Sequence, residues 1–202
     1  MSSSSPLDFY FDFSSPYGYL ASHRIDELAG RHGRTVIWRP FLLGVVFRET
    51  GQTPLKGQKM RGPYHEHDFD RSARRLGITF NPPPNFPFPA QAASRGFYWL
   101  ADRDPAQAVA FAKAVYRAAF AEARNVTEID RLVEIAQSVG ADPAAFRAGL
   151  ADPAIKERLK IETDGAIARG VFGSPFIFVD GEPFWGHDRL DQIEEWLKRG
   201  GW

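Results

Sequence analysis

The chain has 202 residues, of which 44% are hydrophobic and 25% charged, values ordinary for a globular protein with a sizeable core. Lys plus Arg and Asp plus Glu each number 25, so no net field favours nucleic acid or an anionic membrane as a partner. The absence of cysteine excludes disulfides, thiolate metal sites and a redox dithiol of the protein's own. The N-terminal Met-Ser-Ser-Ser-Ser lacks the features of a secretory signal, and no stretch approaches the ~18 apolar residues of a membrane span. We therefore expect a cytoplasmic protein.

Residues 7–20 predict a strand that runs directly into a helix. Apolar residues at 7, 9, 11 and 13 alternate with polar or amphipathic ones, the period-2 pattern of a half-buried strand. Ser15 is a favoured N-cap and Pro16 suits the first helical position, so we expect a helix from there to about Ala29. Such a junction collects free backbone N–H groups and the positive end of a helix dipole, which suits an anion. The alternative is that Ser15 only caps the helix.

The middle of the chain is mainly helical. Residues 35–38 predict a second strand, and a right-handed βαβ unit if the two strands pair in parallel. An apolar run at 41–48 and a loop at 51–63 follow. Helices are expected over 63–169, interrupted by a proline-rich extended stretch at 81–89. Their start signals are Asp-Pro pairs at 104, 142 and 152, and Thr127 with Asp130, a pair that resembles a capping box.

Strand character returns near the C-terminus. Residues 176–179 lead through Asp180-Gly181, a strong hairpin turn, into 182–186, and a last helix is expected from Asp188. The order β-α-β, helical block, β-β-α is the connectivity of an α/β thioredoxin-like domain that carries a large all-helical insertion. We assign 1–45 and 170–202 to the discontinuous thioredoxin-like domain and 46–169 to the insertion.

Four motifs carry a resemblance that covers nearly the whole chain. They are Phe-Asp-Phe-Ser-Ser-Pro-Tyr at 11–17, Arg-Pro-Phe-Leu-Leu-Gly at 39–44, Gly-Ser-Pro-Phe at 173–176 and Trp-Gly-His-Asp-Arg-Leu at 185–190. Together they make the sequence similar to the 2-hydroxychromene-2-carboxylate isomerases and the related kappa-class glutathione transferases, relatives of the DsbA oxidoreductases.

The resemblance implies a glutathione site. Oxidoreductases of this fold place a Cys-x-x-Cys pair at the first strand–helix junction, whereas the resembled family has serine there and uses the thiol of glutathione. Ser15 is then the catalytic residue that contacts the sulfur. Ser174, before an expected cis Pro175, is the residue whose backbone pairs with the cysteinyl main chain. The resemblance implies that Trp185, Gly186, His187 and Asp188 bind the γ-glutamyl end. The alternatives are a tight turn at 174–175 and a capping role for Asp188.

The substrate side follows from the same resemblance. The family pattern Lys-x-x-Tyr-x-x-x-Asp-x-x-Arg reads Arg61, Tyr64, Asp68 and Arg71 here, so that Arg replaces Lys. Either Arg61 or Arg48 is a candidate to hold a carboxylate, the alternative for each being a solvated side chain. Asn85 and Phe86 are candidates for the pocket wall. His65 and His67 lie two apart, so they do not face one metal on a helix, and we expect no metal site.

The activity implied is a glutathione-dependent isomerisation of a small aromatic carboxylate from ring degradation. A 2-hydroxychromene-2-carboxylate-type hemiketal opens, a thiolate adds to its double bond, and elimination after rotation returns the trans alkene. One alternative is a kappa-type transferase, and another is a non-catalytic binding or chaperone module on the thioredoxin scaffold. The oligomeric state stays open, with a homodimer as one alternative.

Overall fold

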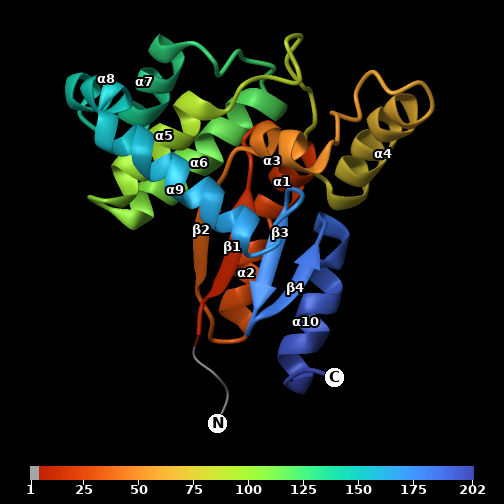
Figure 1. Ribbon diagram of the computed structural model, residues 1–202. Coiled ribbons are helices and arrows are strands. Elements are labelled where there is room, and N and C mark those ends of the chain that lie inside the picture. The colour runs from red at the N-terminus through yellow and green to blue at the C-terminus, as the bar shows by residue number, and fades with distance from the viewer. Residues whose placement is uncertain (1–4) are drawn as a thin grey trace.

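A four-stranded mixed sheet in the order β2-β1-β3-β4 forms the centre of the molecule (Figure 1). The computed structural model describes residues 5–202; residues 1–4, part of the stretch predicted to lack a secretory signal, lie outside the described residues. Strand β1 (Leu7–Phe11) pairs in parallel with β2 (Val36–Pro40) and antiparallel with β3 (Phe176–Val179). The Asp180-Gly181 turn joins β3 to antiparallel β4 (Glu182–Trp185), as predicted. The thioredoxin-like connectivity is confirmed.

Helices surround this sheet and form a block between β2 and β3. Those of the first and last segments are α1 (Pro16–Ser22), α2 (Ile25–Arg31), the short 3₁₀ helix η1 (His187–Arg189) and α10 (Leu190–Arg199). Those of the block are α3 (Leu43–Thr50), α4 (Arg61–Leu76), α5 (Gln91–Ala101), α6 (Pro105–Phe120), α7 (Ile129–Ser138), α8 (Pro143–Ala151) and α9 (Pro153–Ala168). In Figure 1, α5–α8 gather at one end of the sheet, and α4 stands apart from them on the other side of α1.

Strand β1 is buried on both faces, which the alternating pattern did not predict. Phe9 and Phe11 belong to the larger apolar cluster, whereas Tyr10 belongs to a smaller one with Phe41 and Phe178 on the opposite face. The smaller cluster is closed by residues of α3 and α9. Because helices cover both faces, Tyr10 is buried as well, whereas Asp8 near the start of the strand is only partly buried.

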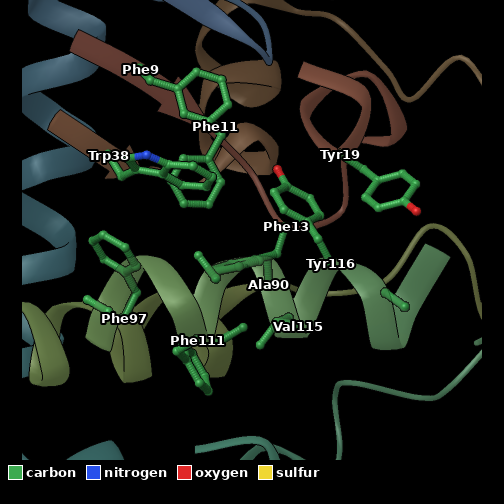
Figure 2. Packing of buried hydrophobic residues seen from close by; sticks show 14 of the residues in the cluster. Phe9, Phe11, Phe13, Tyr19, Trp38, Ala90, Phe97, Phe111, Val115 and Tyr116 are labelled. Carbon is green, nitrogen blue, oxygen red and sulfur yellow. The ribbon is translucent and has the colours of Figure 1, made fainter. Parts of the chain in front are cut away.

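The larger apolar cluster is shared between the sheet and the helical block (Figure 2). The ring of Phe11 lies 5.3 Å from that of Trp38 on β2, 5.9 Å from Phe97 on α5 and 5.7 Å from Tyr116 on α6. Aromatic pairs at these separations add to the free energy of burial. We propose 46–169 as an insertion in the sequence, but its buried side chains share their core with the sheet, so α5 and α6 hold the end of β1 in place.

Two local predictions are wrong and several are confirmed. The single helix expected over 16–29 is two helices, because the Ser22 hydroxyl donates to the Tyr19 carbonyl and competes with the helical hydrogen bond there. Thr127 does not cap: α7 follows Glu128, and the Thr127 hydroxyl donates to Asn125. The confirmed start signals are the N-caps Ser15, Asp104, Asp142 and Asp152, each followed by proline. Within residues 5–202 no helix is long and apolar enough to cross a membrane.

Asp152 ends α8 and caps α9, so its removal should destabilise the fold measurably. Its Oδ1 accepts a hydrogen bond of 2.8 Å from the backbone N–H of Ala154. We expect Asp152→Ala to lower the free energy of unfolding by about 1 kcal/mol, and Asp152→Asn, which keeps the acceptor, by much less. Urea denaturation of both variants checks this. Equal losses would show that the capping bond is not the source of the effect.

Candidate functional site

Ser15 connects the start of α1 to the segment that precedes β3. Its Oγ accepts the backbone N–H of Gly18 at 3.0 Å and donates to the carbonyl oxygen of Ser174 at 2.9 Å. The residue is buried, with 5% of its surface exposed. The hydroxyl has one proton, so Ser15 must turn away from Ser174 to donate to any ligand. The first turn of α1 also offers fewer free donors than the sequence predicts, because Pro16 has no N–H and Ser15 occupies that of Gly18.

The segment before β3 ties three parts of the fold together. The Ser174–Pro175 peptide is cis, as the resemblance implies. Ser174 Oγ accepts the backbone N–H of Asp12 at 2.9 Å, and the Pro175 carbonyl accepts that of Gly186 at 3.0 Å. The end of β1, the start of β3 and the turn after β4 are thereby fixed relative to one another.

Asp12 is a buried carboxylate that the sequence analysis did not single out. Its Oδ1 accepts the backbone N–H and the hydroxyl of Ser14, both at 2.7 Å, and its Oδ2 accepts the backbone N–H of Leu43 at 2.8 Å. Burial raises the pKa of Asp12, an effect that these hydrogen bonds only partly offset. The Tyr116 hydroxyl donates to the Asp12 carbonyl at 2.9 Å. Asp12 is thus a structural centre next to Ser15, joining β1 to α3 and α6.

The segment 185–188 turns from β4 into η1. Trp185 is 55% exposed and its ring lies 4.8 Å from that of Phe172. Gly186 has φ 114°, and a Cβ there would lie 2.4 Å from Asp188 Oδ1, so the turn requires glycine. Asp188 caps neither η1 nor α10, contrary to the alternative interpretation, and its Oδ2 lies 3.3 Å from Arg189. Asp188 lines the cavity described next.

A cavity of about 1360 Å³ brings most of the predicted site residues together. Its lining includes Ser15, Ser174, Trp185, Gly186, His187, Asp188, Arg48, Arg61, Tyr64 and Phe86. Pro175 lies directly behind Ser174 but is not part of the wall. Asn85 is also absent from the wall, because its side-chain amide donates to Asn125 at 2.8 Å. Single-ligand pockets are typically 300–1,000 Å³, so this cavity has room for a tripeptide and a second small molecule.

The charges of the lining favour anions. Seven basic side chains face five carboxylates, the basic ones being Arg24, Arg48, Lys56, Arg61, Arg71, Arg75 and Arg189. Arg24 pairs with Asp191 and Arg71 with Asp68. Arg48, Arg61 and Arg75 form no ion pair with any carboxylate in the part of the chain that the structure describes. Three cations are therefore available for the carboxylates of ligands.

Titratable side chains on α1 and α4 meet in a contact that the sequence analysis did not predict, although it named Asp68 and Arg71 in the family pattern and considered His65 as a metal ligand. The Tyr17 hydroxyl donates to Asp68 Oδ2 at 2.5 Å and lies 3.4 Å from His65 Nδ1, and Arg71 also donates to Asp68. Burial raises the pKa of Asp68, but the hydrogen bonds from Tyr17 and Arg71 outweigh it and lower that pKa overall. Burial and the Asp68 charge raise the pKa of Tyr17, and burial lowers that of His65. The sequence feature that could have pointed to this contact is Tyr17, which follows Ser15 by two positions in the same motif.

Comparison with known proteins decides the family. The family model of the DSBA-like thioredoxin domain matches residues 6–198. A 2-hydroxychromene-2-carboxylate isomerase of Pseudomonas putida is 34% identical over 197 residues, covering 96% of this chain and 94% of its own length. The chain belongs to the 2-hydroxychromene-2-carboxylate isomerase family. A solved structure of such an isomerase superposes with a TM-score of 0.87 at 32% identity, over 96% of this chain and 94% of that one.

The kappa-class transferases are more distant relatives. Glutathione S-transferase kappa 1 of Caenorhabditis elegans is 26% identical over 205 residues, covering 96% of this chain and 91% of its own.

Within residues 5–202 no three His, Asp or Glu side chains converge in a way that could hold a metal ion.

Gly18 is required for the close approach of α1 to α6, and a double-mutant cycle tests this. A Cβ at position 18 would lie 2.5 Å from Tyr116 Oη. We expect Gly18→Ala to lower the free energy of unfolding by about 1–3 kcal/mol, because the hydroxyl must leave the Asp12 carbonyl. Tyr116→Phe, which removes that hydroxyl, should recover part of the loss, so that the double variant loses less than the sum of the singles. Strict additivity in urea denaturation would contradict the contact. Gly30→Ala on α2, with nothing within 4 Å, is the control and should not be destabilised.

Proposed function

We propose that the protein is a glutathione-dependent isomerase of 2-hydroxychromene-2-carboxylate-type intermediates of aromatic degradation. The observation that carries the proposal is the position of Ser15 at the strand–helix junction, where its hydroxyl donates to the Ser174 carbonyl. Ser15 lines a large cavity whose basic side chains outnumber its carboxylates. A chain without cysteine cannot supply a thiol itself. A small thiol bound beside Ser15 would fill that role, and a cytoplasmic location would provide glutathione.

The residues present fit glutathione. Ser174 lines the cavity just before β3, where its backbone could pair with an extended cysteinyl unit as a strand does. Asp188 offers a carboxylate for the γ-glutamyl ammonium, and Arg75 an unpaired cation for a carboxylate. His187 and Trp185 complete the wall on this side, and Gly186 lets the turn approach closely. These residues would hold the peptide along the β3 side of the cavity.

Bound glutathione would supply a thiolate that adds reversibly to the conjugated double bond and leaves after rotation. A free thiol has a pKa of about 8.5, so the protein must favour the thiolate at neutral pH. Ser15 can do so by turning its hydroxyl from Ser174 toward the sulfur, and the excess of cations in the wall acts in the same direction. Each pKa unit gained corresponds to about 1.36 kcal/mol.

The aromatic substrate would occupy the side of the cavity between α3, α4 and the proline-rich segment. Phe86 and Phe88 line it, with Phe69 and Tyr64 from α4. Arg48 and Arg61, both without a carboxylate partner among residues 5–202, are the candidates to bind the substrate carboxylate. Asn85 is bound to Asn125 and is withdrawn from the proposed wall.

The kappa-type transferase remains the alternative within the enzymes, since relatives of that class match most of the chain. A non-catalytic binding module remains the alternative outside them. Subunit association, including a homodimer, is a separate question that measurement of the mass in solution would answer.

Ser15→Ala should lower kcat/KM by about ten- to a thousand-fold, comparable to the loss of one hydrogen bond made in the transition state. Steady-state kinetics with glutathione and a hydroxychromene carboxylate measures this, with calorimetry to show that glutathione still binds. The matched control is Ser22→Ala, which removes another buried serine hydroxyl of α1 away from the cavity. An Ser15→Ala enzyme as active as the Ser22→Ala control would remove Ser15 from catalysis.

An isomerase releases glutathione in every cycle, whereas a transferase consumes one thiol for each product. With substrate in large excess we expect many turnovers per glutathione and a constant free-thiol concentration. Thiol titration alongside the ultraviolet spectrum of the substrate measures both. Thiol that falls mole for mole with product would replace the isomerase assignment by the transferase. No product and no glutathione binding at millimolar concentration would favour the binding module.

A further inference from the structure

The α1–α4 contact places a hydrogen-bonded chain of three titratable groups in the cavity wall. His65, Tyr17 and Asp68 all line the cavity that holds Ser15. The Tyr17 ring is fixed by Phe69 at 4.6 Å on one side and by His187 at 4.9 Å on another. The Asp68 carboxylate is fixed by Arg71, which also lies 3.4 Å from the Tyr64 hydroxyl. These contacts give the hydrogen-bonded group of His65, Tyr17 and Asp68 a defined geometry, unlike that of free surface side chains.

The directions of the hydrogen bonds assign the tautomer of His65. Tyr17 has a single hydroxyl proton, and the 2.5 Å contact gives it to the Asp68 carboxylate. The imidazole Nδ1, 3.4 Å from the Tyr17 oxygen, must then be the donor toward it. This leaves the lone pair on Nε2. Nε2 has no hydrogen-bond partner in the part of the chain that the structure describes, so it is available to a ligand in the cavity.

The surroundings keep His65 neutral yet able to accept a proton. Burial and Arg61 lower the pKa of His65, whereas Asp68 raises it without reversing the net decrease. An imidazole that is unprotonated at neutral pH is a competent base, and a carboxylate connected to its far nitrogen stabilises the cation that forms. Two further titratable groups lie near Tyr17: the ring of His187 packs against it, and the charge of Asp188 raises its pKa.

We propose that His65 is the general base that opens the hemiketal ring of the substrate, with Tyr17 and Asp68 as positioning residues. This inference rests on the proposed function for its substrate class, but it concerns a separate step from thiol addition. Ring opening requires removal of the hemiketal hydroxyl proton, and the sequence analysis assigned no residue to this step. Ser15 cannot serve, because its own proton is engaged with Ser174 and no base contacts it.

The step is balanced and needs no further reactant. His65 Nε2 takes the proton of the hemiketal hydroxyl, the C–O bond to the ring oxygen breaks, and the hydroxyl carbon becomes the ketone of an α-keto acid. The ring oxygen leaves with the bonding electron pair as a phenolate, and then takes the proton back from the imidazolium. His65 is restored at the end, and the opened cis product is ready for isomerisation.

Ring opening can be measured without glutathione, which separates this proposal from the function. The opened α-keto acid is trapped with saturating semicarbazide, so that the trapping rate reports the opening rate. We expect the wild-type protein to accelerate trapping and His65→Gln to lose at least tenfold of that acceleration. The control is His67→Gln on the same helix, exposed and outside the cavity wall, which should behave as wild type. Denaturation curves of both variants check that they fold equally well.

Substrate choice supplies a second comparison. The open-chain methyl ether of the substrate cannot form the ring, so with glutathione its isomerisation does not need the base. His65→Gln should lose activity on the cyclic substrate and stay within about threefold of wild type on the ether. Equal losses on both, or none on the cyclic substrate, would overturn the role of His65. Accelerated trapping without any trans product would instead overturn the isomerase function and leave the base in place.

The pH profile tests the positioning residues. A base is active when unprotonated, so the trapping rate should rise with pH through the pKa of His65, below the usual value of about 6.5. Because the Asp68 charge raises that pKa, Asp68→Asn should move the acid limb to lower pH. Tyr17→Phe removes the hydroxyl that links His65 to Asp68 but keeps the aromatic ring, and should lower the trapping rate on the high-pH plateau. An acid limb that Asp68→Asn leaves in place would show that the carboxylate does not act through His65.

Discussion

The buried carboxylate of Asp12 is the interaction on which the site depends. It takes three hydrogen bonds from Ser14 and Leu43 in a region with almost no solvent contact, and its own backbone is bonded to Ser174 and Tyr116. Removing one partner of such a group leaves a buried donor unsatisfied, at a cost of about 1–3 kcal/mol each. Four segments distant in sequence therefore have to meet at one point. Ser15 is placed three residues further along the same chain, so its position is determined by that meeting.

The helical block has two different relations to this centre. Helices α5 and α6 share the apolar core of the sheet, and Tyr116 reaches from that core to the Asp12 carbonyl. Helix α4 instead meets α1 mainly through polar and aromatic side chains around Tyr17. The first relation makes the Ser15 junction rigid, and the second closes a cavity beside it. The one helical block thus supports the Ser15 junction, the proposed glutathione side, and also forms the wall of the proposed substrate side.

The connectivity could be predicted from sequence because its signals are local, whereas the proposed glutathione side rests on the resemblance of four motifs to a known family. Ser15-Pro16, the Asp-Pro caps and the Asp180-Gly181 turn each determine the backbone within a few residues. Burial of Asp12 could not be predicted, since the period-2 pattern of β1 describes a strand with one covered face, and α3 and α9 cover the other. The Tyr17–Asp68 contact joins residues 51 positions apart, and Asn85 turns to a partner 40 positions away. Such pairings depend on how helices are docked, which no local pattern records.

Under the proposed function, the Ser15–Ser174 hydrogen bond would let a site without cysteine use a thiol from elsewhere. A neutral hydrogen bond of this kind contributes about 1 kcal/mol, and a bond to an ionised acceptor about twice that. The hydroxyl is therefore satisfied in the absence of ligand, yet a thiolate is the better acceptor and can draw it away at small cost. A neutral thiol offers no such advantage, so in the proposed complex Ser15 would discriminate between the two protonation states of the sulfur. Thiolate selection would then be a property of the competing carbonyl as much as of the serine.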